Sequence, residues 1–419
     1  MRGEAMAETN NDRLKNLAQF KDAALSCAHC GQCRAVAWPS KGIDHLCPVY
    51  ESGEAPNFEP FFSRGKNVIL KGLLWGDLAL NDDLSNLFYE CTLCGACLDF
   101  CHNAHNNNID FANHRWMDQV NVYEALRADL VDAGCGLAPH KQMVDALVKT
   151  GNPYGKERVE KKQWAGKLGF HVKDATVEPT DVLYFAGCTS ALTTNPPLQN
   201  IPVAAAKVFH ELGIDFSILG AKEPCCGSVA LRTGHKRVFD AAADENARLL
   251  KVSKATRVVT SCAGCYRTLK KDYGSRLDGI EIMHLSEFLG DFLSRNKVPL
   301  RKLDITTTYH DPCHLGRHMN VYDAPRDILN RISTFTEMQC AREGAHCCGA
   351  GGGVKKAFPE MALAIARNRV TEATRTGAEY LVSTCPFCYR NLADGAIFLQ
   401  NPIIVKDLTE LMLEAIKSR

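Results

Sequence analysis

The second half of the chain repeats its cysteines at an interval of 122 to 125 residues. The first copy of the pattern consists of Cys188, Cys225, Cys226, Cys262 and Cys265. The second copy consists of Cys313, Cys347, Cys348, Cys385 and Cys388. Other residues keep the same register, since Gly227 and Asn246 match Gly349 and Asn368. Two homologous units of roughly 120 residues are the simplest interpretation of this repeat.

Within each copy, apolar strand-like runs alternate with helical patterns. The runs are 181–188 and 257–262 in the first copy, and 304–313 and 379–385 in the second. The helical patterns include 203–212, 238–251 and 361–376. Each run ends on a cysteine. The pattern predicts an α/β fold with largely parallel strands, in which the cysteines lie just beyond the carboxyl ends of the strands.

The N-terminal part of the chain contains two further groups of four cysteines among short helical patterns. The groups are Cys27, Cys30, Cys33 and Cys47, and Cys91, Cys94, Cys97 and Cys101. The compact CxxCxxCxxxC spacing of the second group is typical of ferredoxins that bind [4Fe-4S] cubes. A zinc ribbon would instead require two CxxC pairs. We therefore expect two cubane clusters here.

The fourth ligand of each cube stays open at this point. In two-cluster ferredoxins the last cysteine of such a run binds the other cluster, so Cys47 and Cys101 can each complete either group. His29, His45 and His102 lie beside these cysteines. Additional ligation by these histidines is conceivable, but surface histidines are the simpler interpretation.

The repeated motif needs a different site. Five thiolates exceed what one tetrahedral zinc or one cube requires. Adjacent cysteines such as Cys225 and Cys226 must lie on a turn, which the following Gly227 permits. In the second copy the glycines of 349–353 allow backbone amides to approach sulfide or substrate. A phosphate-binding loop would need GKS or GKT after these glycines, but Val354 follows them. Ten matching thiols are also an improbable set of inert core residues.

Composition narrows the function classes. With 49 Lys and Arg against 48 Asp and Glu, the net charge is +1, which argues against a nucleic-acid partner. The polar stretch 1–20 has no signal-peptide core, so we expect a reducing cytoplasm, where thiols bind metals. The longest stretch without a formal charge, 182–206, is too polar to span a bilayer, so membrane contact is expected only through a partner.

These residues carry a family resemblance. The stretches HCCGAGGGV (346–354) and STCPFCYRNL (383–392) resemble the CCG domain of heterodisulfide reductases. From about Cys27 to its end, the chain resembles the D-type subunit of that family. We therefore expect an α/β protein with a mainly helical ferredoxin-like domain at 1–140 and CCG domains at 181–300 and 301–419. Between them, turn formers and weak periodicity from about residue 150 to 179 indicate a linker, which we place at 141–180.

In that family each complete set of five cysteines binds a noncubane [4Fe-4S] cluster, and a disulfide is cleaved between the two clusters. The resemblance therefore implies that Cys188, Cys225, Cys226, Cys262 and Cys265 bind one such cluster. It implies that Cys313, Cys347, Cys348, Cys385 and Cys388 bind the other. All ten are also the candidate catalytic residues, for reducing a disulfide or, in reverse, for oxidising thiols.

Two functions from different classes remain. The first is an oxidoreductase subunit of a heterodisulfide-reductase-like complex acting on a small-molecule or protein disulfide. The alternative is an electron relay between a flavoprotein dehydrogenase or bifurcating module and quinone or another enzyme. No flavin-binding GxGxxG or haem-binding CxxCH motif occurs, so we expect electrons from a flavin- or haem-containing subunit of a heteromeric complex.

Several other residues lie near the repeated motif in the sequence. His310, His314 and His346 could donate protons to leaving thiolates, or only hydrogen-bond backbone or sulfide. Arg267 and Arg390 follow the CxxC pairs in both copies, which favours a shared scaffold role. The two cysteines outside the pattern, Cys135 and Cys340, are expected to be ordinary buried thiols.

Overall fold

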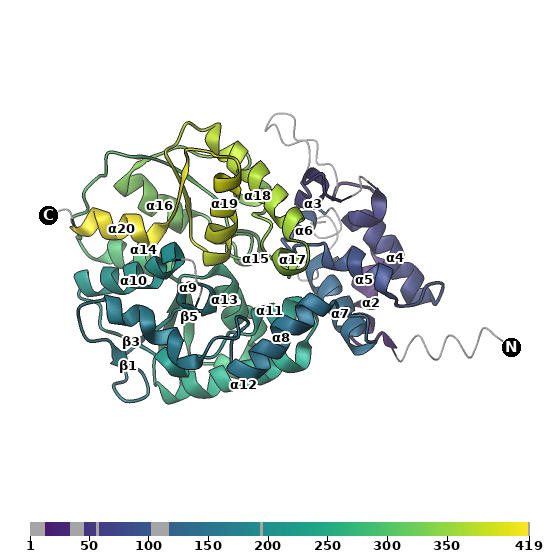
Figure 1. Ribbon diagram of the computed structural model, residues 1–419, viewed down its shortest axis with the longest axis horizontal. Coiled ribbons are helices and arrows are strands. Elements are labelled where there is room, and N and C mark those ends of the chain that lie inside the picture. The colour runs from purple at the N-terminus through teal and green to yellow at the C-terminus, as the bar shows by residue number, and fades with distance from the viewer. Residues whose placement is uncertain (1–12, 34–45, 56–57, 102–116, 193–195, 418–419) are drawn as a thin grey trace, which may run out of the picture. The chain divides into compact units, whose positions relative to one another are not determined.

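The computed structural model describes residues 13–33, 46–55, 58–101, 117–192 and 196–417 (Figure 1). Contacts divide the chain into two compact units. Unit 1 comprises Met1–Gln142, Val229–Lys236 and Gln339–Asn368. Unit 2 comprises Met143–Ser228, Arg237–Met338 and Arg369–Arg419. These units follow contacts and not the sequence repeat, so the predicted domain boundaries stay a prediction.

Unit 1 is helical in its described residues. Its elements are η1 (Leu17–Phe20), α2 (Lys21–Leu25), α3 (Pro48–Glu51), η3 (Glu59–Phe61), α4 (Ser63–Trp75), α5 (Asp82–Tyr89), α6 (Ala96–Asp99), α7 (Gln119–Asp132), η9 (Arg342–Gly344) and α17 (Val354–Ala357). Four helices among the described residues continue from one unit into the other: α8 (Ala138–Thr150), α11 (Ser228–Arg232), α12 (Lys236–Val252) and α18 (Pro359–Thr374). Side-chain caps start two of the longer helices, since Asn81 accepts a hydrogen bond from the Leu84 amide and Asp118 accepts one from the Asn121 amide.

The core of unit 1 is formed by helices that lie near both cysteine groups in the sequence. Leu70 and Leu73 of α4 pack with Phe88 of α5 and with Leu126 and Leu130 of α7. The helices therefore hold the loops with the two cysteine triplets in one compact body.

Unit 2 contains two parallel sheets with matching strand order. The first has the order β1-β3-β2-β4-β5, with β1 (Lys173–Asp174), β2 (Val182–Phe185), β3 (Phe216–Ile218), β4 (Arg257–Thr260) and β5 (Glu281–His284). The second has the order β7-β6-β8-β9, with β6 (Thr306–Tyr309), β7 (Thr334–Phe335), β8 (Tyr380–Ser383) and β9 (Ile404–Asp407). Apart from β1, the two orders are the same, and all pairs are parallel. The predicted fold class is confirmed.

Helices connect and cover these strands (Figure 1). After the first strands come α9 (Cys188–Leu192), α10 (Pro196–Glu211), η6 (Gly220–Lys222), α12 (Lys236–Val252), α13 (Ala263–Arg267), the π-helix η7 (Thr268–Asp272), η8 (Gly274–Leu277) and α14 (Leu285–Arg295). The second sheet is accompanied by α15 (Gly316–Met319), α16 (Asp323–Ile332), α19 (Pro386–Phe398) and α20 (Leu408–Lys417). The predicted helices at 203–212, 238–251 and 361–376 correspond to α10, α12 and α18.

The segment 141–180, predicted as a linker, is partly built into unit 2. The 3₁₀ helix η5 (Arg158–Lys167) buries Trp164, which packs edge-on against Tyr184 of β2 with 6.0 Å between ring centroids. Its turn formers and weak periodicity gave no indication of this burial.

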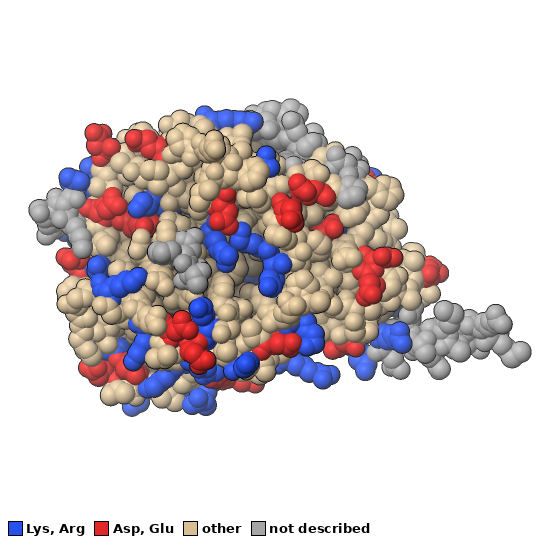
Figure 2. All heavy atoms as spheres, viewed as in Figure 1, with Lys and Arg blue, Asp and Glu red and all other residues tan. Residues whose placement is uncertain are grey.

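Charges of both signs are interspersed on the face shown in Figure 2, in keeping with the net charge of +1. Among the described residues, no helix combines the length and the apolar character that crossing a bilayer requires.

Truncating Phe209 will test the core of unit 2. This α10 side chain is fully buried and lies edge-on to the rings of Tyr184, Phe216 and Phe288. We expect Phe209→Ala to lower the free energy of unfolding by about 3–5 kcal/mol, because a large cavity replaces the ring. Urea unfolding followed by circular dichroism measures this, with the exposed Phe58→Ala as control, expected within about 0.5 kcal/mol of the unchanged protein. Equal losses in both variants would contradict the assigned core.

Candidate functional site

The first set of five cysteines lies at the carboxyl ends of β2 and β4. These strands are neighbours and end together, with Phe185 paired to Thr260. Cys188 begins α9 shortly after β2, and Cys262 caps the start of α13 after β4. The chain leaves β2 toward β3 on one side and returns to β4 on the other, so this edge is the switch point at which such sheets bind ligands.

The five sulfur atoms of this set form a continuous row of contacts. Cys225 hydrogen-bonds to Cys188 and to Cys226, and the Cys265 thiol donates to Cys226 across 3.4 Å between sulfurs. Cys265 also contacts Cys262. All five are buried, and all 20 cysteines, every one within the described ranges, are free thiols. The structure therefore brings together the five residues that the first copy of the pattern contributes.

Two glycines make room for this arrangement. Gly187 has a φ of +76°, and a Cβ there would lie 3.2 Å from the sulfur of Cys265. Gly227 has a φ of +78°, and its amide donates to the sulfur of Cys225 at 3.4 Å. Left-handed backbone is costly for other residues. The adjacent cysteines thus lie on a turn followed by glycine, as the sequence predicts.

A buried ion pair, formed by Lys161 from outside the repeat and Glu223 from within it, touches this set. Lys161 of η5 donates to the sulfur of Cys188 at 3.4 Å, and its ammonium lies 2.9 Å from Glu223 and 3.1 Å from the carbonyl of Pro224. Glu223 in turn accepts from the amides of Ala186 and Gly187. Burial alone would lower the pKa of Lys161, but Cys188 and Glu223 raise it well above its usual value. Sequence reasoning missed both charged residues.

Three cysteines of the second set lie in unit 2. Cys385 precedes the first turn of α19 after β8, and Cys388 lies one turn further, which matches Cys262 and Cys265. Cys313 follows β6. Cys347 and Cys348 belong to unit 1, so the assembly of this set of five stays a prediction. Within unit 1, the Gly349 amide donates to the sulfur of Cys347 at 3.4 Å, as at the first copy.

The two sets meet inside unit 2. The thiol of Cys262 is hydrogen-bonded to that of Cys385. Contacts with Cys262 and Cys388 hold the pKa of Cys385 well below its usual value, whereas the Cys385 contact and burial raise that of Cys262. One sulfur from each copy of the repeat therefore lies at a common boundary.

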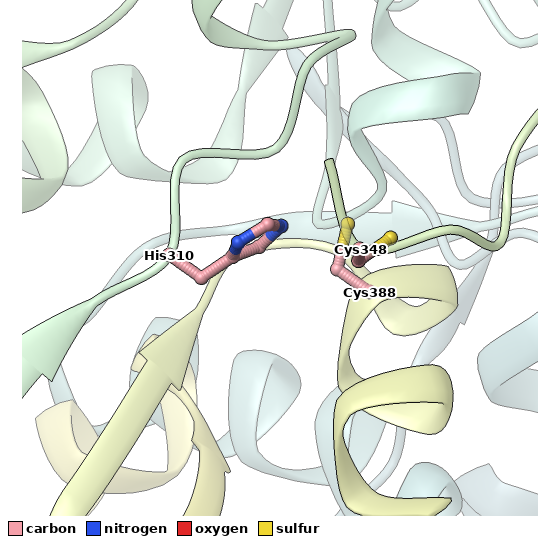
Figure 3. A group of neighbouring side chains, drawn as sticks. All are labelled: His310, Cys348 and Cys388. Carbon is pink, nitrogen blue, oxygen red and sulfur yellow. The ribbon is translucent and has the colours of Figure 1, made fainter. Parts of the chain in front are cut away.

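His310, just after β6, has a defined tautomer. Its Nδ1 accepts from the guanidinium of Arg369 at 3.2 Å, so the ring proton is on Nε2. Nε2 is buried and has no hydrogen-bond partner among the described residues. The ring reaches to within 4.8 Å of the sulfur of Cys388 (Figure 3). Burial lowers the pKa of His310 to about 3, so the ring is neutral at neutral pH and keeps one N–H.

The other histidines named from the sequence are less informative. The ring of His314 lies 4.5 Å from that of His318, and His346 belongs to unit 1. His29 is exposed, as expected of a surface histidine, and His45 and His102 lie outside the described residues. Arg267 lies 3.7 Å from Asp272, an ion pair that fits a scaffold role.

In unit 1, the two cysteine triplets form loops with the same backbone conformation. His29 and Leu93 both have a φ of 55°, and the glycines that follow, Gly31 and Gly95, have φ values of 84° and 77°. Each loop thus bends twice through left-handed conformations between its cysteines. Such turning lets several thiols of one short segment face the same centre.

A cavity lies between these loops in unit 1. Its lining includes Cys33, Cys47, Cys91, Cys94 and Cys97. Cys47 interacts electrostatically with Cys94 and Cys91, whereas Cys101 interacts with Cys33. Burial raises the pKa of Cys47 to about 12, so in the absence of a metal this thiol keeps its proton. Cys47 therefore lies beside the second triplet, and Cys101 interacts with one cysteine of the first.

The glycines after Cys348 contact the second triplet loop within unit 1. A Cβ at Gly351 would lie 2.9 Å from the carbonyl oxygen of Thr92, and one at Gly352 would lie 2.6 Å from that of Cys91. The buried guanidinium of Arg127 joins both segments, because it donates to the carbonyls of Cys91 at 2.6 Å and Gly352 at 2.8 Å. Sequence reasoning assigned these glycines to an approach of sulfide or substrate, whereas here they allow two backbones to pack.

The donor sets fit iron–sulfur groups. If all five thiols were neutral, Glu223 would be the only negative partner of the Lys161 ammonium in this set. The ammonium also contacts the sulfur of Cys188, a position that suits a negatively charged thiolate. Lys66, which is buried beside Cys91 and Cys47, is a comparable cation at the N-terminal cavity. Buried cations against sulfur suit thiolates that share the negative charge of a cluster.

Comparison with known proteins agrees with this arrangement. The family model for a cysteine-rich domain matches residues 182–270 and 307–393, and the model for a 4Fe-4S dicluster domain matches residues 7–105. The expected order of one ferredoxin-like region and two cysteine-rich repeats is confirmed. The matches support iron–sulfur clusters in both parts of the chain.

Individual relatives point in the same direction. The chain is 37% identical, over 96% of both sequences, to the D-type subunit of dihydromethanophenazine:CoB–CoM heterodisulfide reductase from Methanosarcina mazei. It is 27% identical to EtfAB:quinone oxidoreductase of Syntrophomonas wolfei, over 80% of this chain and 47% of that one. A solved structure of a hypothetical protein from Helicobacter pylori shares the fold, with a TM-score of 0.54 and 12% identity over 88% of this chain and 71% of that one.

Replacing Gly187 will test the packing of the first set. We expect Gly187→Ala to lower the iron and sulfide content of anaerobically purified protein, because its Cβ displaces Cys265. Gly213→Ala is the matched control, since Gly213 also has a positive φ, of +68°, but has open space at its Cβ. Both variants bear a similar backbone penalty, so equal iron contents would contradict the assigned contact.

Proposed function

Because this chain belongs to the family of D-type heterodisulfide reductase subunits, we propose that it is an iron–sulfur electron-transfer subunit that reduces a disulfide at its two five-cysteine sets. In the net reaction, two electrons and two protons convert one disulfide into two thiols. The reverse reaction would oxidise two thiols to a disulfide. The contact between Cys262 and Cys385 carries this proposal, because it joins the two sets where a reaction of two electrons requires them.

The cysteine pattern and the thiol contacts within each unit support the following ligand assignment. Cys188, Cys225, Cys226, Cys262 and Cys265 would bind one noncubane [4Fe-4S] cluster. Cys313, Cys347, Cys348, Cys385 and Cys388 would bind the second. Cys27, Cys30 and Cys33 with Cys101 would bind one cubane cluster, and Cys91, Cys94 and Cys97 with Cys47 the other. When bound, these clusters would supply single electrons and ligation for sulfur.

The chain itself would supply a hydrogen-bond donor close to the reacting sulfur atoms. His310 holds its proton on Nε2, near Cys388, and Arg369 fixes this tautomer. A neutral imidazole N–H can stabilise a developing thiolate by hydrogen bonding without adding a buried charge. His310 is therefore the residue we assign to orient a sulfur of the substrate or of the cluster.

Electrons would reach this chain from a flavin- or haem-containing redox subunit of a heteromeric complex. The Methanosarcina mazei relative is named as one subunit of its reductase, so that enzyme contains more than one kind of chain. A cytoplasmic location, and membrane contact only through such a partner, stay predictions.

An electron relay without substrate chemistry is the second candidate. One observation favours it: each cysteine of the first set is less than a tenth exposed, so a substrate would require an opening to reach it. The relative named EtfAB:quinone oxidoreductase belongs to this functional class by its name. The relay would pass electrons between a flavoprotein and quinone or another enzyme.

Electron paramagnetic resonance of the anaerobic full-length protein separates the two candidates. We expect CoB–CoM heterodisulfide, added to protein whose clusters have first been chemically reduced, to induce a new paramagnetic signal, which Cys262→Ser abolishes and Cys135→Ser preserves. Cys135 lies outside the repeated pattern and is the matched control. An unchanged spectrum, with the iron of both sets in place, would favour the relay.

The cubane assignment has its own test. We expect Cys47→Ser to perturb the cluster of Cys91, Cys94 and Cys97, because a serine oxygen replaces one sulfur ligand there. Cys101→Ser should perturb the other cube. Combining each serine variant with removal of one triplet cysteine, and measuring the remaining cubane signals, identifies the pairing. If Cys47→Ser instead perturbed the cluster of Cys27, Cys30 and Cys33, or Cys101→Ser that of Cys91, Cys94 and Cys97, the crossed arrangement would be contradicted.

A further inference from the structure

The two copies of the repeat differ in charge beside their cysteines. Lys161 precedes the first copy in sequence, and its partner Glu223 lies two residues before Cys225. The corresponding residue in the second copy, two before Cys347, is Ala345, which has no carboxylate. A carboxylate at this position is therefore present in the first copy only.

The surrounding structure holds Lys161 rigidly. Glu157 and Glu160 form a capping box at the start of η5, and Trp164 anchors the same helix in the core. The ammonium lies 5.6 Å from the ring centroid of Phe185 and is only 3% exposed. Its charge is consequently neither screened by water nor free to move away from Cys188.

A buried ion pair is a weak contributor to stability, because both charges lose their hydration. The ammonium of this pair also has a second partner, because it donates to the sulfur of Cys188 in addition to Glu223. Glu223 is stabilised separately by two backbone amides. The positive charge of Lys161 therefore contacts the sulfur of Cys188, and the negative charge of Glu223 contacts the ammonium.

We propose that Lys161 is a positioning residue that raises the reduction potential of the first five-cysteine centre, and that Glu223 moderates this effect. The proposal rests on the proposed function, in which this centre holds an iron–sulfur cluster. Reduction adds negative charge, so a fixed cation at a ligand sulfur favours the reduced state and a nearby carboxylate opposes it. The two halves of the duplicated fold would then differ in potential.

Potentiometric titration of the anaerobic full-length protein, followed by paramagnetic resonance, tests this directly. We expect Lys161→Met to reduce the equilibrium constant for reduction of the first centre at least tenfold, which is about 59 mV for a one-electron couple. Glu223→Gln should shift the potential in the opposite direction. Lys161→Arg should restore most of the potential, because it keeps the charge.

A matched control is the exposed neighbour Lys162 on the same helix. Lys162→Met should leave the potential unchanged. A merely structural role of Lys161 would not produce shifts of opposite sign in Lys161→Met and Glu223→Gln. Shifts of the same sign, or no shift in either variant at full iron content, would overturn the inference. If Lys161→Met does not retain iron, the test rests on Glu223→Gln, which should raise the reduction potential of the first centre. If that potential does not rise, the proposal is rejected.

Iron and sulfide analysis keeps this inference separate from the proposed function. If Cys265→Ser removes no iron, the first set holds no cluster and the proposed function itself fails. If Cys265→Ser removes iron but the Lys161 and Glu223 variants leave the potential unchanged, the present inference alone fails.

Discussion

Two neighbouring parallel strands that end together determine where the first five sulfur atoms lie. Because β2 and β4 pair through Phe185 and Thr260, the segments that follow them start at the same edge of the sheet. The chain turns to opposite sides after these strands, so neither connection covers this edge. Cys188 and Cys262 occupy it, and the turn with Cys225 and Cys226 closes the group. The second sheet repeats the same strand order, which places Cys385 next to Cys262.

Charge is the second constraint on this site. A group of thiolates is stable in a buried place only if cations or hydrogen bonds accompany it. Lys161 meets this need at Cys188, and Lys66 lies near Cys91 and Cys47 in the N-terminal cavity. At His310 a neutral N–H takes this place, because burial, together with the nearby guanidinium of Arg369, disfavours a second positive charge. The chain thus surrounds sulfur with different polar groups at different positions.

The sequence allowed the strands, the principal helices and the convergence of the first cysteine set to be predicted. Alternating apolar runs define β2, β4, β6 and β8, and the spacing of the repeat fixes where cysteines follow them. Lys161 could not be found in this way, because it contacts Cys188 across 27 residues of sequence from a segment rich in turn formers. The grouping of Cys47 and Cys101 depends on how two loops cross in space. From the sequence, the glycines 351–353 could serve either an approach of backbone amides to sulfide or substrate, or close packing of two backbones. Only the packing in the structure distinguishes these two roles.

The contacts of Arg127 have a consequence for how the polypeptide can be divided. Its guanidinium binds backbone oxygens on both sides of a junction, one from the loop of the second triplet and one from the glycine run of the second repeat. A fragment that lacked the first hundred residues would leave Gly351 and Gly352 without the surface against which they pack. The second repeat is therefore not an interchangeable module, because it shares a packed interior with the ferredoxin-like region. Joining the two parts in one chain fixes their ratio at one to one.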